Sequence, residues 1–260
     1  MLQARMNSMD AVLNYLEQKL QGVFVSKTPS SVLVVWWPTQ QTEASVKYGS
    51  FITRGMNQGP HRLEDKVLHA FQSSLVKYSY DRKDDNFCLC IGEQNLQGTW
   101  NDEKMMQQAA SLLNIEYKPG GTSKPPNNYQ QVNDIFHIWS RAAFGGIQKT
   151  DVDLVLFDDD SQHVKAIVEV KRSAKIKVGE WTPFRNDPYG GLIGIAQSKK
   201  VPFLTVHHEL AGSSQGAIQN MQVDIFCWYP DKPFKFDEFA SAENRKIWTI
   251  GQLSEYLKNL

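Results

Sequence analysis

The apolar positions of the chain change repeatedly between helical spacing and short continuous runs, which predicts a mixed α/β protein. In the first half, helical spacing predicts helices over residues 9–20, 61–79, 102–115 and 129–143. Continuous runs rich in Val, Ile, Phe and Trp predict strands at 31–37, 45–53 and 87–91. The prolines and glycines of residues 118–128 interrupt both patterns and predict a loop.

The second half carries the clearest alternation of elements. The pattern predicts strands at 152–157, 164–170, 202–207 and 223–228, with helices at 192–200 and within 252–260. We therefore expect N-terminal α+β elements over residues 1–60 as a recognition lobe and a core over residues 61–210. A C-terminal strand and helix, within residues 211–260, would pack on that core.

Composition narrows the class of protein. With 41% hydrophobic residues, the chain is too apolar to be disordered as a whole. The longest early apolar run, Val32 to Trp37, is far shorter than the ~18 residues of a membrane helix. No secretory signal is expected, and three cysteines are an odd number that indicates reduced thiols. These features favour a cytoplasmic protein without a membrane partner, with the nucleus as an alternative location.

Residues 150–172 predict a β-hairpin whose turn lies around Ser161. Symmetric pairing across this turn places Asp153 opposite Glu169 and Asp151 opposite Lys171. Because strand side chains alternate between faces, these four polar residues share one face. The other face is apolar and is expected to be buried; it carries Leu154, Leu156, Ala166, Val168 and Val170.

Two carboxylates that face each other across a strand pair repel, and a divalent cation between them removes that penalty. Asp153, Glu169 and the backbone carbonyl of Val170 are oxygen ligands suited to Mg²⁺, with Asp151 as the alternative to Asp153. Lys171 lies two residues along the same face as Glu169 and could hold or help deprotonate a metal-bound water. These parts suit the hydrolysis of phosphodiesters.

The pattern Asp153…Glu169-Val170-Lys171 resembles the PD-(D/E)xK nuclease superfamily, which has the restriction-endonuclease-like fold. The resemblance is strongest over residues 129–210. It implies an α/β fold with a mixed central sheet flanked by helices, in the order α-β-β-β-α-β. The first helix would be residues 129–143 or 61–79, and the second residues 192–200. It also implies Mg²⁺ as cofactor, with Mn²⁺ as a substitute.

The sequence departs from the family pattern at one position, because Val152 stands where proline usually precedes the first Asp. Many family members also have a helix-borne Glu, for which Glu64 is the candidate. Some have a Gln after the motif, for which Gln197 is the candidate.

Basic residues gather after the motif, although the chain as a whole has 28 basic and 28 acidic residues. Such clusters can contact phosphates. The candidates for contacting nucleic acid are Arg172, Lys175, Lys177, Arg185, Lys199 and Lys200. The aromatic residues Trp181, Phe184 and Tyr189 could stack on bases or pack the loop that carries them.

The sequence thus favours a metal-dependent endonuclease that cleaves DNA, of the restriction or homing type. A nuclease of DNA repair or recombination is the main alternative, RNA is an alternative substrate, and a homodimer is an open alternative to a monomer. Two interpretations in which the protein is not an enzyme also remain. One is a nucleic-acid-binding protein that retains the fold, and the other is a structural hairpin in which E-x-K occurs by chance.

Overall fold

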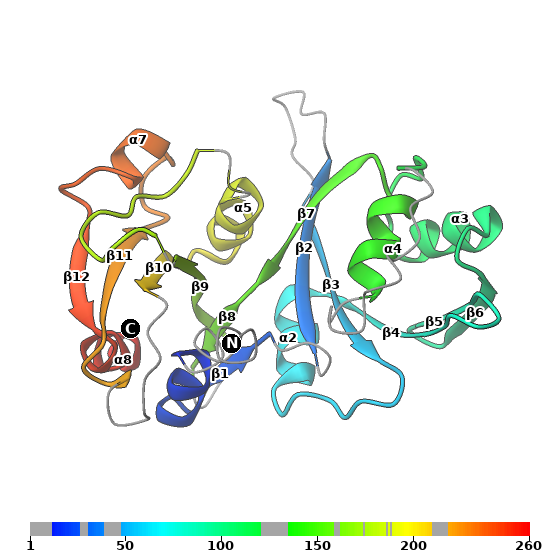
Figure 1. Cartoon of the computed structure of the whole chain (residues 1–260), viewed down its shortest axis with the longest axis horizontal. Coiled ribbons are helices and arrows are strands. Elements are labelled where there is room, and N and C mark those ends of the chain that lie inside the picture. Colours follow the sequence, from blue (N-terminus) through cyan, green and yellow to red (C-terminus); the bar gives the residue numbers. More distant parts are fainter. Residues whose placement is uncertain are drawn as a thin grey trace. The chain divides into compact units, whose positions relative to one another are not determined.

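The chain forms two compact units (Figure 1). The computed structural model describes residues 12–26, 31–38, 48–120, 135–158, 162–173, 175–185, 187, 189–209 and 218–260. Met1–Val25 and Val152–Leu260 form one unit, here called the hairpin unit, and Ser26–Asp151 form the other, the inserted unit. These boundaries differ from the divisions that the sequence predicted at residues 60 and 210. The difference arises because both ends of the chain add strands to one sheet.

The hairpin unit contains a six-stranded mixed sheet in the order β1-β8-β9-β10-β11-β12. β1 (Val23–Val25), β8 (Leu154–Phe157) and β9 (Val164–Ser173) pair antiparallel. Helix α5 (Tyr189–Lys199) then leads to β10 (Phe203–Glu209), which pairs parallel to β9. β11 (Gln222–Trp228) and β12 (Lys246–Thr249) extend the sheet antiparallel.

The hairpin has the register that the sequence predicted. Leu154 pairs with Val168 and Leu156 with Ala166, as expected for pairing across Ser161. The register shifts only between Leu156 and Phe157, next to the turn. The predicted apolar face is confirmed, because its five residues lie in a core that also takes apolar residues from the helical segment 12–19 and from α8 (Ile250–Lys258).

The opposite face of this sheet is covered as well. Helix α5 packs on β9 and β10, and α7 (Phe236–Phe239) packs on β11. The ring centre of Phe239 lies 5.9 Å from that of Phe203 and 6.2 Å from that of Phe226 here. Burial on both faces explains why β9 is apolar from Ala166 to Val168 instead of alternating.

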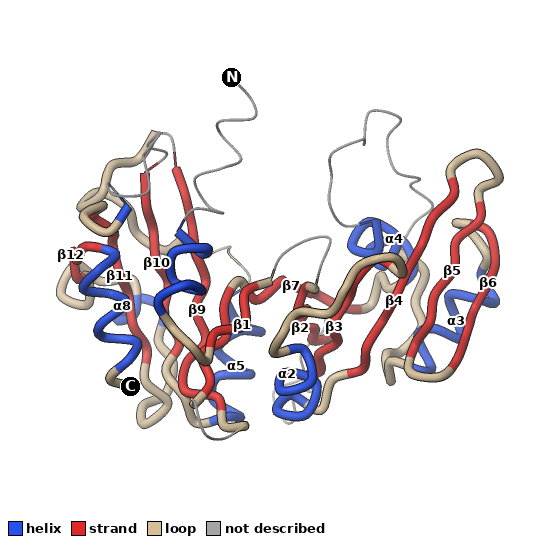
Figure 2. The backbone as a smooth tube through the Cα atoms, turned by 90° about the horizontal axis from the view of Figure 1, so that it is seen from below, coloured by secondary structure: helices blue, strands red, loops and turns tan. Residues whose placement is uncertain are grey.

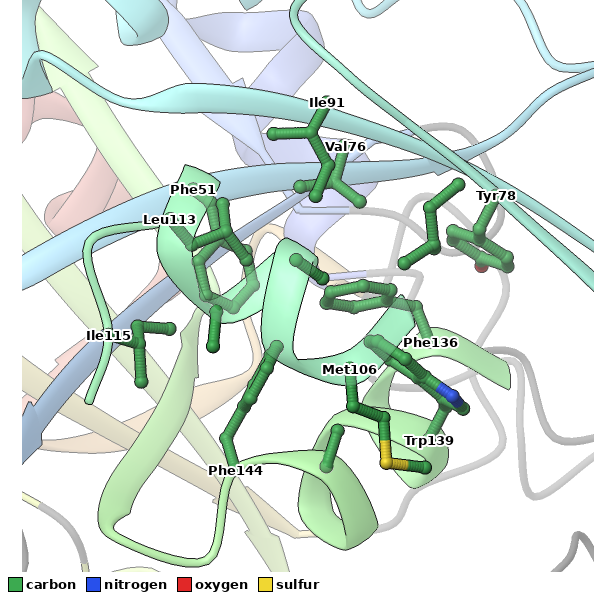
Figure 3. Packing of buried hydrophobic residues seen from close by; sticks show 14 of the residues in the cluster. Phe51, Val76, Tyr78, Ile91, Met106, Leu113, Ile115, Phe136, Trp139 and Phe144 are labelled. Carbon is green, nitrogen blue, oxygen red and sulfur yellow. The ribbon is translucent and has the colours of Figure 1, made fainter. Parts of the chain in front are cut away.

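The inserted unit has its own six-stranded sheet, in the order β6-β5-β4-β3-β2-β7, and Figure 2 shows its strands side by side. Its strands are β2 (Val32–Pro38), β3 (Gly49–Gly55), β4 (Ser74–Asp81), β5 (Asn86–Ile91), β6 (Gln94–Thr99) and β7 (Ile147–Val152). Its helices are α2 (Glu64–Phe71), α3 (Glu103–Leu112) and α4 (Ile135–Ala143). Residues of α3 and α4 pack against the sheet in a core rich in aromatic rings, among them Phe136 and Trp139 (Figure 3).

Most predicted elements are present, with one clear error. Residues 61–79 do not form one helix: α2 ends at Phe71, Gln72 takes a left-handed conformation with φ of 50°, and β4 begins at Ser74. The helical spacing of α2 continues without interruption into the strand pattern of β4, so the sequence did not indicate that the helix ends between them. Strands β1, β4, β6, β7 and β12 and helix α7 were not predicted. The helix at 102–115 is confirmed, with Asp102 capping Met105 N–H; of 129–143, residues 129–134 lie outside the described residues.

The mixed α/β class is confirmed, but the helix that precedes the hairpin differs from the expectation. Helices α2 and α4, which the sequence offered for that place, both belong to the inserted unit. In the hairpin unit the preceding helix is residues 12–19, and the inserted unit lies between β1 and β8 along the chain. Across the described ranges, every helix is too short or too polar to span a membrane.

Candidate active site

Asp153 lies at the break between β7 and β8, where the chain enters the hairpin. Its Oδ2 accepts a hydrogen bond from the Val170 backbone N–H at 2.7 Å. This bond ties the start of β8 to β9. It therefore places the Asp153 carboxylate next to Glu169 and Val170, as the predicted register required.

Glu169 and Lys171 lie on the same face of β9, two residues apart. Glu169 is buried, with 6% of its surface exposed, and its Cα pairs with that of Thr205 on the neighbouring strand β10. Lys171 Nζ lies 2.8 Å from Glu169 Oε1, and the Lys171 side chain is 28% exposed. The pair therefore joins a buried carboxylate to an ammonium group that solvent can reach.

Two further residues complete this group, and the sequence interpretation missed both in this role. Asp187 Oδ2 lies 4.0 Å from Lys171 Nζ. The Tyr189 hydroxyl donates a hydrogen bond to the same Oδ2 at 2.8 Å, and Lys171 Nζ lies 5.9 Å from the centre of the Tyr189 ring. The only signal in the sequence was an acidic and an aromatic residue just before the helix that follows the E-x-K motif.

The electrostatics keep Lys171 charged. Burial by itself lowers the pKa of Lys171, but the negative charges of Glu169, Asp187 and Asp153 together raise that pKa above its ordinary value. Burial, the hydrogen bond to Asp187 and the charge of Glu169 raise the pKa of Tyr189, so its hydroxyl stays a neutral donor. Lys171 is thus suited to orient a nucleophile or stabilise negative charge, and less suited to remove a proton.

The donor chemistry of this group fits a hard divalent cation. Asp153 and Glu169 supply carboxylate oxygens from neighbouring strands, and Mg²⁺ in proteins is commonly held by only one or two carboxylates plus water. In the part of the chain that is described, no three or more His, Cys, Asp or Glu side chains gather into a group that could hold a metal ion. A magnesium site here would therefore depend on two carboxylates, solvent and the Val170 carbonyl that the sequence indicated.

Asp151 and Glu64, the other carboxylates named from the sequence, belong to the inserted unit. Burial raises the pKa of Asp151, and the nearby cations Lys149 and Arg141 oppose that rise. Glu64 accepts a hydrogen bond from Ser31 Oγ at 2.5 Å and pairs with Arg54 at 3.3 Å. Glu64 therefore serves as the counter-charge of a buried arginine within its own unit.

The basic candidates differ in how accessible they are. Arg172, Lys175, Lys177 and Lys200 are exposed, while Lys199 is half-buried at the end of α5. Arg185 pairs with Asp237 and lies 5.0 Å from the centre of the Phe236 ring, so it already has partners within the protein. Gln197 is exposed on α5.

The three aromatic residues that the sequence offered for stacking on bases have different surroundings. Trp181 is buried and stacks on His207, with ring centres 4.9 Å apart, so it packs the loop. Tyr189 is buried and its hydroxyl binds Asp187. Only Phe184, 52% exposed, presents a surface that could meet a base.

A buried polar network holds the start of this loop, and sequence reasoning did not identify it. His207 Nδ1 lies 3.1 Å from Asp224 Oδ2, and the Gly179 N–H donates to Asp224 Oδ1 at 2.8 Å. Arg245 donates to the backbone carbonyls of Gly179 and of Trp181, the latter at 3.0 Å. These bonds fasten the loop to strands β10 and β11, on the face that carries Glu169 and Lys171.

Comparisons of this chain with protein-family models, with curated proteins and with solved structures find no match. The candidate site is therefore argued from its own geometry.

Proposed function

We propose that this protein is a magnesium-dependent nuclease whose hairpin unit hydrolyses phosphodiester bonds of DNA. One observation carries the proposal: Asp153, at the entry to the hairpin, accepts a hydrogen bond from the Val170 N–H between Glu169 and Lys171, and the lysine lies 2.8 Å from the buried glutamate. Two carboxylates and a lysine on one sheet face are the parts that metal-assisted phosphodiester hydrolysis requires.

The topology of the hairpin unit supports this proposal. Along the chain the unit has a helix at residues 12–19, three antiparallel strands β1, β8 and β9, helix α5 and the parallel strand β10. This is the α-β-β-β-α-β order that the resemblance to the PD-(D/E)xK superfamily implies. The carboxylates occupy the hairpin of this unit, where the resemblance puts them.

In the proposed mechanism Asp153 and Glu169 would hold Mg²⁺ together with the Val170 carbonyl, and Mn²⁺ would be a substitute. When bound, the ion would supply Lewis-acid activation of the phosphate and of the attacking water. Lys171, on the same face of β9 as Glu169, would orient the attacking water through its charged ammonium group and stabilise the negative charge that develops on the phosphoryl oxygens. Exposed Arg172, Lys175, Lys177 and Lys200 would contact the DNA backbone.

The same site admits more than one biological use. A sequence-specific enzyme of the restriction or homing type is the form we favour, with the inserted unit supplying recognition. A repair or recombination nuclease would use the same residues on a DNA structure instead of a sequence.

Cleavage of supercoiled plasmid tests the proposal. We expect nicking or linearisation by the wild type with Mg²⁺ or Mn²⁺, none with EDTA, and a loss of at least about a hundredfold in Lys171→Ala. Lys165→Ala, which removes another lysine from the same strand β9, is the matched control and should cleave like the wild type.

Each outcome has a clear meaning. Discrete fragments would indicate a sequence-specific enzyme. Activity that survives Lys171→Ala would contradict the site. A wild type that cleaves neither plasmid, single-stranded DNA nor RNA in Mg²⁺ would overturn the nuclease proposal and favour a binding protein that retains the fold.

A further inference from the structure

Lys171 and the proposed metal compete for one carboxylate. The Lys171 ammonium lies 2.8 Å from Glu169 Oε1, and this carboxylate is one of the two side chains that would bind Mg²⁺. A cation bound at Glu169 would repel an ammonium group held so close. Lys171 therefore needs a second partner if it is to stay in the site when the metal is present.

We propose that Asp187, held by Tyr189, receives the Lys171 ammonium when Mg²⁺ occupies Glu169, so that Asp187 and Tyr189 are positioning residues for Lys171. The inference rests on the proposed function. It extends that function by assigning a role to two residues that the D…E-x-K pattern does not contain.

The distances suit such a transfer. Asp187 Oδ2 lies 4.0 Å from Lys171 Nζ, so a movement of about 1 Å would form an ordinary charge-assisted hydrogen bond. The Lys171 side chain is a flexible chain of four carbons and is 28% exposed, so its ammonium group has room to move. The Tyr189 ring, 5.9 Å from Nζ, adds a weak attraction on the same side.

Tyr189 is held firmly enough to fix the position of Asp187. Its ring is 2% exposed and packs against Phe203 at 5.9 Å and Phe239 at 6.0 Å. Its hydroxyl donates to Asp187 Oδ2 at 2.8 Å, and its backbone N–H donates to the Asp187 carbonyl, also at 2.8 Å. Tyr189→Phe would remove the hydroxyl bond and leave the ring packing intact.

Calorimetric titration of the metal-free protein with Mg²⁺ tests the inference without measuring cleavage. We compare the wild type, Asp187→Asn, Lys171→Met and the double variant, with circular dichroism to show that each is folded. Asp187→Asn should weaken Mg²⁺ binding by about tenfold, because the displaced lysine has lost its second partner. Tyr189→Phe should weaken it by a few-fold.

The double variant separates an action through Lys171 from direct metal binding. In the Lys171→Met background, Asp187→Asn should leave the Mg²⁺ affinity unchanged, because no ammonium has to move. The same tenfold loss in both backgrounds would overturn the inference and make Asp187 a metal ligand. Asp231→Asn removes a carboxylate from another loop of the hairpin unit and controls for general charge effects; its Mg²⁺ affinity should equal that of the wild type.

The Mg²⁺ titration gives different results if this inference is wrong and if the proposed function is wrong. If the wild type binds Mg²⁺ and Asp187→Asn binds it equally well, the positioning role is wrong and the nuclease proposal stands. If the wild type does not bind Mg²⁺, the proposed function fails and the inference falls with it.

Discussion

The two sheets of this protein bury different kinds of side chain. The core that α3 and α4 close in the inserted unit is rich in aromatic rings. Elsewhere this unit buries the hydroxyl residues Ser31, Thr53, Ser140 and Thr150 and the charged residue Glu64, which pairs with Arg54. In the hairpin unit one face of the sheet packs a mainly aliphatic core, with Tyr15, Trp248 and Tyr256 against it, while the other face carries buried polar residues beside the rings of Phe203 and Phe226. Those polar residues are Glu169, Thr205, His207 and Asp224.

This contrast indicates where stability and where chemistry reside. Burying a charge or an imidazole costs free energy unless partners compensate for it, whereas aromatic packing is favourable by itself. In the hairpin unit the buried polar residues share the face and the neighbourhood of Lys171 and Asp187. We infer that this face of the hairpin unit, on which Glu169 and Lys171 lie, trades stability for function.

The largest expected effect is the loss of aromatic packing in the inserted unit. Trp139 is fully buried, with ring centres 4.9 Å from Phe87 and 5.6 Å from Phe144, and its Nε1 donates to the Trp100 carbonyl at 3.1 Å. Trp139→Ala should lower the free energy of unfolding of this unit by about 3–5 kcal/mol. Hydrogen exchange followed by mass spectrometry, peptide by peptide, reports this loss for each unit separately. Equal loss of protection in the hairpin unit would contradict the assignment of this core to one unit.

The second largest loss of stability should come from breaking the Glu64–Arg54 ion pair of the inserted unit. Glu64→Ala leaves the Arg54 side chain, 11% exposed, without its counter-charge, so we expect a loss of about 3 kcal/mol in denaturant unfolding. Glu255→Ala breaks the exposed pair with Lys258 and is the control, expected to cost less than about 1 kcal/mol. Similar losses in both variants would show that burial of Glu64 is not what matters.

The polar network of the hairpin unit should make stability depend on pH. Burial lowers the pKa of His207 below its ordinary 6.5, and the opposing charge of Asp224 does not restore it. Below about pH 6.5 the unfolded chain therefore binds a proton that the folded state rejects, so the free energy of unfolding falls as pH falls.

The slope approaches ~1.4 kcal/mol per pH unit for one such group. Denaturant unfolding between pH 5.5 and 7.5 measures it, and His207→Gln should reduce the slope relative to the wild type. Burial also lowers the pKa of His208, so part of the slope should remain in this variant. A slope unchanged by His207→Gln would contradict the role given to His207.

The smallest expected change in stability comes from the residue with the largest expected part in catalysis. Glu169→Gln removes a buried charge beside Asp153 and leaves Lys171 near Asp187, so the metal-free protein should gain up to about 1 kcal/mol. Mg²⁺ should raise the melting temperature of the wild type and leave that of Glu169→Gln unchanged. A variant that loses several kcal/mol would show that Glu169 is a structural residue.

The register of the hairpin could be predicted from the sequence because it is set locally. The alternation of side chains and the turn around Ser161 were enough to place Asp153 beside Glu169, and Glu169 on the face of Lys171. The prediction was wrong where a helical pattern runs directly into a strand pattern. This happens between Phe71, where α2 ends, and Ser74, where β4 begins. Local patterns also could not show that β1 and β8, far apart in the chain, are neighbours in one sheet.

What only the tertiary structure decided is which distant residues meet. Asp187 reaches Lys171 because its loop folds back over β9, and that loop is held by Asp224 of β11 and by Arg245, which precedes β12. Such contacts depend on how the whole chain packs, which no short stretch of sequence encodes. The sequence by itself determined the two carboxylates and the lysine of the hairpin, because pleating and turn geometry act over a few residues. Packing between remote segments then selected Asp187 and Tyr189 as the neighbours of Lys171.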